Sequence, residues 1–122
     1  MSQESRFTIV HANDVEKSGP KWSLVRRSLG VKSFGLNLVE IPPGEGIPEH
    51  DERERDQEEV FYVISGKPTF EIDGERYPVP AGTFVRLDPE PTRKFVNEGD
   101  EPARVLVISA PRSSGYEPMG WA

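Results

Sequence analysis

Residues 58–66 read EEVFYVISG, and this stretch carries the clearest fold signal in the chain. Its apolar centre has the length of a short β-strand, and a serine-glycine pair ends it. Successive side chains of a strand point to opposite faces, so Glu59, Phe61 and Val63 share one face. The stretch therefore predicts a core strand that carries one carboxylate on its buried side.

Other short apolar runs lie on both sides of this strand and are separated by turn residues. Asp73 and Gly74 supply the two left-handed positions of a tight hairpin turn between residues 69–72 and 76–79. Further strands are predicted at residues 7–10, 22–28, 34–41, 83–87, 94–96 and 105–108. About nine short strands joined by turns are typical of a sandwich or closed barrel, so we expect an all-β fold.

Length and composition favour one domain. A chain of 122 residues can bury one core but not two independent ones, and its 11 glycines and 12 prolines are spread along it. We therefore expect a single domain over residues 1–122 with its core at about 34–110. The ends, residues 1–6 and 112–122, are polar and are expected at the periphery.

Composition also excludes several kinds of chemistry. The chain has no cysteine, which excludes disulfides, thiolate metal sites and cysteine nucleophiles. The net charge is −6, and residues 49–59 hold seven acidic side chains against two arginines, which disfavours a nucleic-acid partner. No export signal and no apolar window long enough for a membrane span are evident, so we expect a cytoplasmic protein without a membrane partner.

A set of spaced polar residues points to a site. Gly44 is followed after five residues by His50, Glu52 lies two residues further on, and Glu59 and Gly66 follow at six-residue gaps. On a strand, His50 and Glu52 point the same way because they are two residues apart. One imidazole and two carboxylates can thus converge on one point.

A second spaced set consists of Gly82, Pro89, Arg93 and Asn97. Together the two sets resemble the motifs of the cupin family, in which histidines stand at the positions of Glu52 and Arg93. Ten residues separate Gly82 from Arg93, as in the family, so Arg93 is a replacement within the motif. The resemblance implies a single jelly-roll barrel, also called a double-stranded β-helix, with metal ligands at the barrel mouth, and it implies a homodimer.

The altered motif leaves two interpretations of the site open. In one, His50, Glu52 and Glu59 bind a divalent iron, manganese, zinc or nickel ion with one position free for substrate. Arg93 opposes this, because a fixed charge about 4 Å from the ion costs on the order of 8 kcal/mol at an effective dielectric constant near 20 unless Glu52 and Glu59 offset it. In the other, Arg93 takes the place of the metal and pairs with Glu59 or Glu52.

A partly neutralised Arg93 would offer a docking point for a carboxylate or phosphate of a small ligand. Arg86, on the preceding strand, either assists or faces solvent. The apolar lining expected around such a ligand comes from Phe61, Val63, Phe70, Ile72, Phe84 and Val105.

These observations favour a small-molecule-binding cupin with an altered metal site, whose ligand is a small acidic or polyhydroxylated metabolite. One alternative is a metal-dependent enzyme of the dioxygenase, isomerase or decarboxylase type. Another is a non-catalytic structural or interaction subunit. His11 has no acidic neighbour at ligand spacing and is expected to be an ordinary surface residue.

Overall fold

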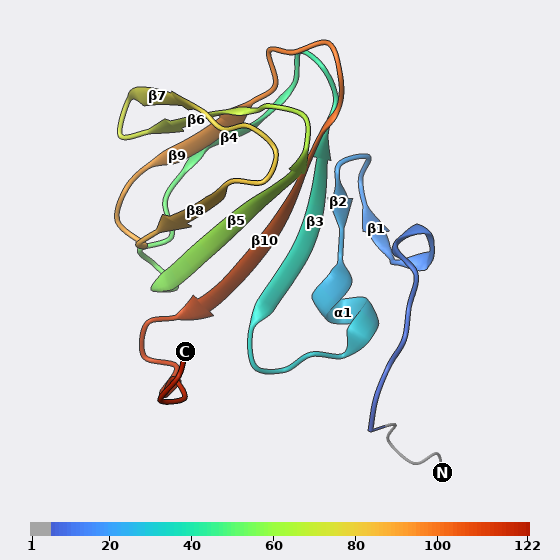
Figure 1. The fold of residues 1–122 in the computed structure, drawn as a ribbon, viewed down its shortest axis with the longest axis vertical. Helices are drawn as coiled ribbons and strands as arrows, with labels where there is room; N and C mark the ends of the chain where they lie inside the picture. Colours follow the sequence, from blue (N-terminus) through green and yellow to red (C-terminus); the bar gives the residue numbers. More distant parts are fainter. Residues whose placement is uncertain (1–5) are drawn as a thin grey trace.

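Two antiparallel β-sheets build the protein in a computed structural model that describes residues 6–122 (Figure 1). The larger sheet has the strand order β1 (Lys17–Ser18), β2 (Trp22–Ser23), β3 (Gly35–Ile41), β10 (Ala103–Pro111), β5 (Gln57–Ser65) and β8 (Phe84–Leu87). The smaller sheet has the order β4 (Gly46–His50), β9 (Arg93–Val96), β6 (Thr69–Ile72) and β7 (Glu75–Pro78). The predicted all-β jelly-roll fold is thus confirmed.

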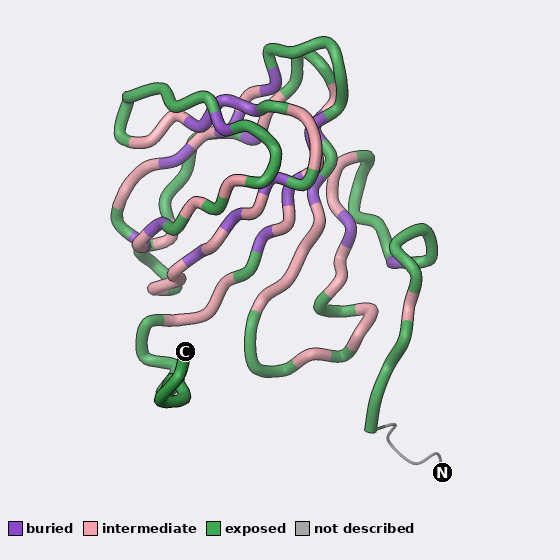
Figure 2. The backbone as a smooth tube through the Cα atoms, in the orientation of Figure 1, coloured by how far each residue is buried: buried purple, intermediate pink, exposed green. Residues whose placement is uncertain are grey.

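The stretch that carried the fold signal forms β5, which lies between β10 and β8. Its side chains alternate as predicted: Glu59, Phe61 and Val63 are buried, whereas Val60 and Tyr62 lie on the outer face. Figure 2 shows buried segments along the strands that face the opposite sheet. The strand therefore brings the Glu59 carboxylate into the space between the sheets.

Tight turns close the hairpins where the sequence predicted them. Asp73 and Gly74 have φ angles of 49° and 84°, as the turn between β6 and β7 requires. After β5 the chain turns at Gly66, where an added Cβ atom would lie 2.7 Å from the Cα atom of Ala103. Glycine is therefore required there for the chain to pass close to β10.

The two motif regions are joined at the far end of the barrel. The backbone N–H of Gly44 donates to the carbonyl oxygen of Asn97 at 2.8 Å, and the N–H of Asn97 donates to Glu45 at 2.9 Å. The buried side-chain amide of Asn97 donates to the carbonyl oxygens of Ile41 and Glu101, both at 2.8 Å. Asn97 therefore stabilises a chain corner.

Three sequence predictions about local structure were wrong. Residues 7–10 form no strand, and Ile9 is 88% exposed, because no neighbouring strand is there to pair with them. The strand expected at residues 22–28 ends at Ser23. Strand β4 was not predicted, because its only fully buried side chain is Ile47 and the charges around it concealed the pattern.

Helical structure is confined to short segments. The second half of the strand expected at residues 22–28 instead belongs to helix α1 (Val25–Leu29). This helix ends at Gly30, which has a left-handed φ of 80°. A 3-10 helix, η1 (Ala12–Asp14), is capped by His11, whose Nδ1 accepts from the N–H of Asn13 at 3.0 Å. In the described part of the chain, no helix has the length and apolarity needed to cross a membrane.

Three phenylalanine rings fill the space between the sheets. Phe61 makes edge-to-face contacts with Phe70 and Phe95, with ring centroids 5.5 Å and 4.8 Å away. Phe70 and Phe95 stack with their centroids 4.3 Å apart. All three are at most 2% exposed, so the middle of the barrel is packed and not hollow.

Replacing Phe61 by alanine is expected to lower the free energy of unfolding by about 3–5 kcal/mol, because it leaves a cavity among the three rings. Phe7→Ala is the matched control, since Phe7 is 75% exposed. It should change stability by no more than about 0.5 kcal/mol. Urea unfolding checks both values, and equal effects of the two substitutions would contradict this description of the core.

Candidate functional site: a buried charge cluster

Four polar side chains meet where the two sheets approach each other: Arg93 and Glu59 are buried, Glu52 is half-buried and His50 is exposed. His50 ends β4 and lies opposite Arg93, the first residue of β9, in the strand register. Glu59 comes from β5 in the other sheet, and Glu52 from the turn between β4 and β5. The N–H of Glu52 donates to the carbonyl oxygen of Pro89 at 2.9 Å, which ties this turn to the segment before β9.

Arg93 is completely buried and links the two sheets. Its Nη1 donates to Oε1 of Glu59 at 3.0 Å, and its Nη2 donates to the backbone carbonyl oxygen of Asp88. Its Nε has no hydrogen-bond partner among residues 6–122. Because both terminal nitrogens already hold the protein together, the guanidinium offers no free two-pronged face to a ligand.

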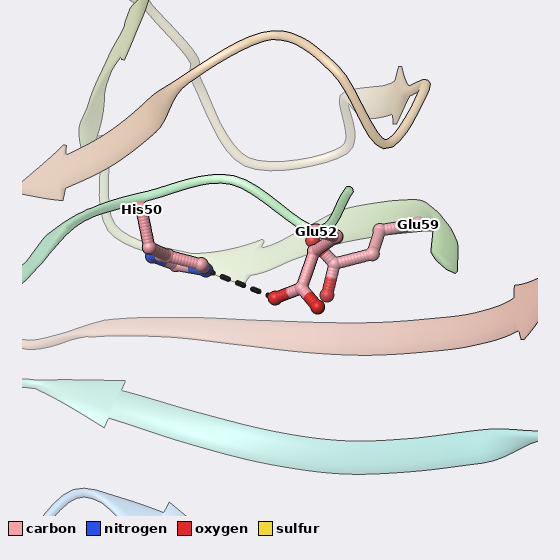
Figure 3. A group of neighbouring side chains, drawn as sticks. All are labelled: His50, Glu52 and Glu59. Carbon is pink, nitrogen blue, oxygen red and sulfur yellow. Dashed lines mark ion pairs between the residues drawn. The ribbon is translucent and has the colours of Figure 1, made fainter. Parts of the chain in front are cut away.

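His50 and Glu52 form the outer part of the cluster. Nε2 of His50 lies 3.3 Å from Oε2 of Glu52, and Nδ1 lies 2.9 Å from the carbonyl oxygen of Pro48. Figure 3 shows the two side chains pointing toward each other, with Glu59 beside Glu52. One potential ligand atom from each of these three side chains lies within 4.8 Å of the other two. The structure thus brings together the imidazole and both carboxylates.

The electrostatics of the cluster centre on Glu59. Burial raises the pKa of Glu59, and the Glu52 carboxylate raises that pKa further. The charges of Arg93 and His50 and the hydrogen bond from Arg93 lower it, but they do not outweigh the burial. Arg93, Glu52 and Glu59 together carry a net charge of −1, and one proton on Glu59 makes these three side chains neutral.

The donor atoms of the cluster are suitable for a divalent metal ion, but the positive charge of Arg93 beside them is not. One imidazole and two carboxylates are usual ligands for zinc, manganese, iron or nickel. An ion bonded to Oε1 of Glu59 at about 2.1 Å would lie at most about 5 Å from Nη1 of Arg93. The repulsion at that distance is about 7 kcal/mol at an effective dielectric constant near 20. The Glu52 and Glu59 carboxylates attract the ion and offset this repulsion in part or in full, so the cluster fits a metal ion less well than the same donors would without Arg93.

The turn at residues 51–56 accounts for the long gap between His50 and Glu59. Nη2 of Arg112 contacts Asp56 at 2.8 Å and Glu90 at 2.6 Å, which anchors this turn to the end of β10. The additional residues form an exposed turn. His50 from one sheet and Glu59 from the other therefore still approach each other.

A separate pocket of about 450 Å³ lies between β7 and β8, the edge strands of the two sheets. Both strands lie in the left half of Figure 1. The lining is mainly apolar and includes Phe70, Ile72, Tyr77, Val85, Arg86 and the exposed Phe84. Four residues predicted to contact a ligand, Phe70, Ile72, Phe84 and Arg86, thus border this pocket, although Phe70 itself is fully buried.

The other predicted lining residues lie elsewhere. Phe61 and Val63 belong to the packed core, at 2% and 0% exposure. Arg86 is mostly exposed, and its Nη1 contacts the carboxylates of Glu58, at 3.3 Å, and Asp88. Arg86 therefore lies at the outer edge of the pocket and not in the buried cluster with Arg93.

The sequence did not identify Tyr77 as part of the pocket wall. Tyr77 lies opposite Phe70 in the register of β6 and β7 and therefore shares its face of the sheet. Its hydroxyl donates to Oε2 of Glu75 at 2.8 Å. The alternation of the predicted hairpin was the signal that could have located this residue.

Comparison with known proteins identifies the family. Residues 37–109 match the family model of the cupin domain, and this match covers more than half of the chain. The chain therefore belongs to the cupin family, as the spaced motifs indicated.

Similar proteins include members with different descriptions. A cupin protein from Bacteroides fragilis is 22% identical, with 97% of this chain and 94% of that chain covered and a TM-score of 0.80. A putative sugar phosphate isomerase from Acidithiobacillus ferrooxidans is 27% identical, with coverages of 72% and 56% and a TM-score of 0.63. Polyketide synthase CurC from Streptomyces cyaneus is 32% identical over 84 residues, which are 69% of this chain and 53% of CurC. The chain spans about half the length of the curated relatives it matches.

Glu59→Gln is expected to change how stability depends on pH. Because the native pKa of Glu59 lies above its ordinary value of 4.5, the native state holds more protons than the unfolded state between the two values. Wild-type stability therefore falls as the pH rises through this interval, whereas glutamine does not titrate. The unfolding free energy of the variant minus that of the wild type should rise from about pH 4 to about pH 7.

Urea unfolding across this pH range measures the difference. The exposed Glu117→Gln variant is the control and should give a nearly constant difference. A difference for Glu59→Gln that stays constant or falls with pH would contradict the assigned electrostatics.

Proposed function

We propose that this cupin is a metal-independent small-molecule-binding protein whose ligand lies in the pocket between β7 and β8. The observation that supports the proposal is the mainly apolar pocket of about 450 Å³ between these edge strands of the two sheets. Small-molecule sites are typically concave, on the order of 300–1,000 Å³, and lined by apolar groups with a few polar ones.

The lining favours a ligand with an apolar body and one acidic group. Both contacts of Arg86 with carboxylates use Nη1, which leaves Nη2 and Nε as donors. An anionic group at the outer edge of the pocket can bind these donors while the apolar part contacts Ile72 and Tyr77. The carboxylates of Glu58 and Asp88 also lie against Arg86 and repel such a group, so the mainly apolar lining, more than the charge, favours the acidic metabolite over the polyhydroxylated one.

In this proposal the buried cluster supports the pocket without reacting. Ile72, which lines the pocket, lies opposite Arg93 in the register of β6 and β9. The ion pair between Arg93 and Glu59 joins this smaller sheet to the larger one. The pair thus holds in place the strand that forms the inner wall of the pocket.

A metal-dependent enzyme is the second candidate. It is favoured by the convergence of ligand atoms from His50, Glu52 and Glu59 within 4.8 Å, and by the description of one similar structure as a putative sugar phosphate isomerase. The charge of Arg93 is the argument against it. The interaction subunit, the homodimer and the cytoplasmic location stay predictions.

Binding of two naphthalene probes tests the pocket. The aromatic sulfonate 1-anilinonaphthalene-8-sulfonate should bind the wild type, and Tyr77→Ala should weaken its binding about tenfold because a wall of the pocket is lost. Arg86→Met should weaken the sulfonate about fivefold but leave the neutral N-phenyl-1-naphthylamine unchanged. Fluorescence titration gives each dissociation constant.

Phe7→Ala is the control for these titrations, since Phe7 is exposed but does not line the pocket. The proposal would be wrong if Phe7→Ala weakened the sulfonate as much as Tyr77→Ala does. It would also be wrong if neither pocket variant changed the affinity of the folded protein for either probe.

A further inference from the structure

A polar pocket of about 240 Å³ lies at the opposite edge of the larger sheet. It is formed by β1, β2, β3 and β10 together with η1, whose Ala12 and Asn13 line it. The strand register sets Lys17 opposite Ser23 and Glu40 opposite Arg104. These side chains therefore belong to neighbouring positions of one sheet.

Positive charge dominates the lining of this pocket. Lys17, Lys21 and Arg104 are cationic, and Glu40 is the single acidic member among the described lining residues. The lining carries a net charge of +2, or +1 once Glu45, the partner of Lys21, is counted, in a chain whose net charge is −6. Such a local reversal of sign attracts small anions.

Two of the three cations have donors to spare. Nζ of Lys17 donates to the neutral hydroxyl of Ser23 at 2.8 Å, and no carboxylate within residues 6–122 pairs with it. Nε of Arg104 lies 4.0 Å from Oε1 of Glu40, and in the described part of the chain the Arg104 guanidinium donates no hydrogen bond. A guanidinium carries five N–H groups, so a second anion can be accommodated there.

Lys21 is already paired with a carboxylate, which leaves it less able to bind an anion. Its Nζ lies 3.0 Å from Oε1 of Glu45 and 3.4 Å from the carbonyl oxygen of Gly46. Lys17 and Arg104 therefore carry the recognition, and Lys21 contributes to the pocket wall.

We propose that this pocket binds a phosphate group, either as the free ion or at the end of a small phosphorylated molecule. Phosphate has several strong acceptor oxygens that suit an ammonium and a guanidinium together. The volume equals that of roughly eight water molecules, which holds a phosphate with a few attached carbons but not a nucleotide. The site lies apart from the pocket of the proposed function and does not depend on it.

Calorimetric titration with inorganic phosphate at low salt tests the site. Lys17→Met and Arg104→Met should each weaken binding about tenfold, the effect of losing one charge-assisted hydrogen bond. Lys67→Met is the matched control because Lys67 is exposed and outside the pocket, and it should bind as the wild type does. Arg104→Lys keeps the charge and should recover part of the affinity. Glycerol phosphate binding more tightly than inorganic phosphate would identify a phosphorylated molecule as the ligand, and equal affinities would identify the free ion.

The proposal would be overturned if wild type showed no phosphate binding, or if Lys67→Met weakened it as much as Lys17→Met. Equal affinities of Lys17→Met and the wild type would also overturn it. Thermal unfolding of each variant confirms that it is folded, and the exposed Lys17 can be replaced without disturbing the core.

Discussion

The ion pair between Arg93 and Glu59 is the interaction on which the site depends. It lies between the two sheets, with the guanidinium fully buried and the donor and acceptor 3.0 Å apart. Removing two charges from water costs several kcal/mol for each ion, and attraction offsets this only with good geometry. The raised pKa of Glu59 indicates that the offset is incomplete. The pair therefore adds little to the free energy of unfolding. Its main effect is to fix the positions of the Arg93 and Glu59 side chains between the sheets.

That constraint explains how the polar and apolar parts of the barrel are separated. Beneath the pair, Phe61, Phe70 and Phe95 pack against one another and leave the interior closed. Space for an organic molecule remains between β7 and β8, the edge strands of the two sheets, which no other strand of residues 6–122 covers. The same fold can thus keep a binding function although the position of the usual metal ligand carries a positive charge.

The fold was predictable because its signals are local. Alternation in β5 and the Asp73–Gly74 turn follow from side-chain period and backbone sterics. Strand β4 escaped prediction because Pro48 and its charged neighbours show no alternation, and its pairing with β9 is a long-range property. Residues 7–10 have strand-like composition but no partner strand, which a local pattern cannot reveal. The convergence of His50, Glu52 and Glu59 could be predicted from their spacing in the sequence. The exposed position of Arg86 could not, because it depends on which strands form the edges of the sheets.

The metal content of the protein tests the central claim most directly. The wild type and Arg93→His, which restores the residue type expected at this position of the family motif, are incubated with zinc, manganese or ferrous ions, dialysed, and analysed by elemental mass spectrometry. We expect far less than one ion per wild-type chain and a clear gain in Arg93→His. About one ion per wild-type chain, lost in His50→Ala, would contradict that claim.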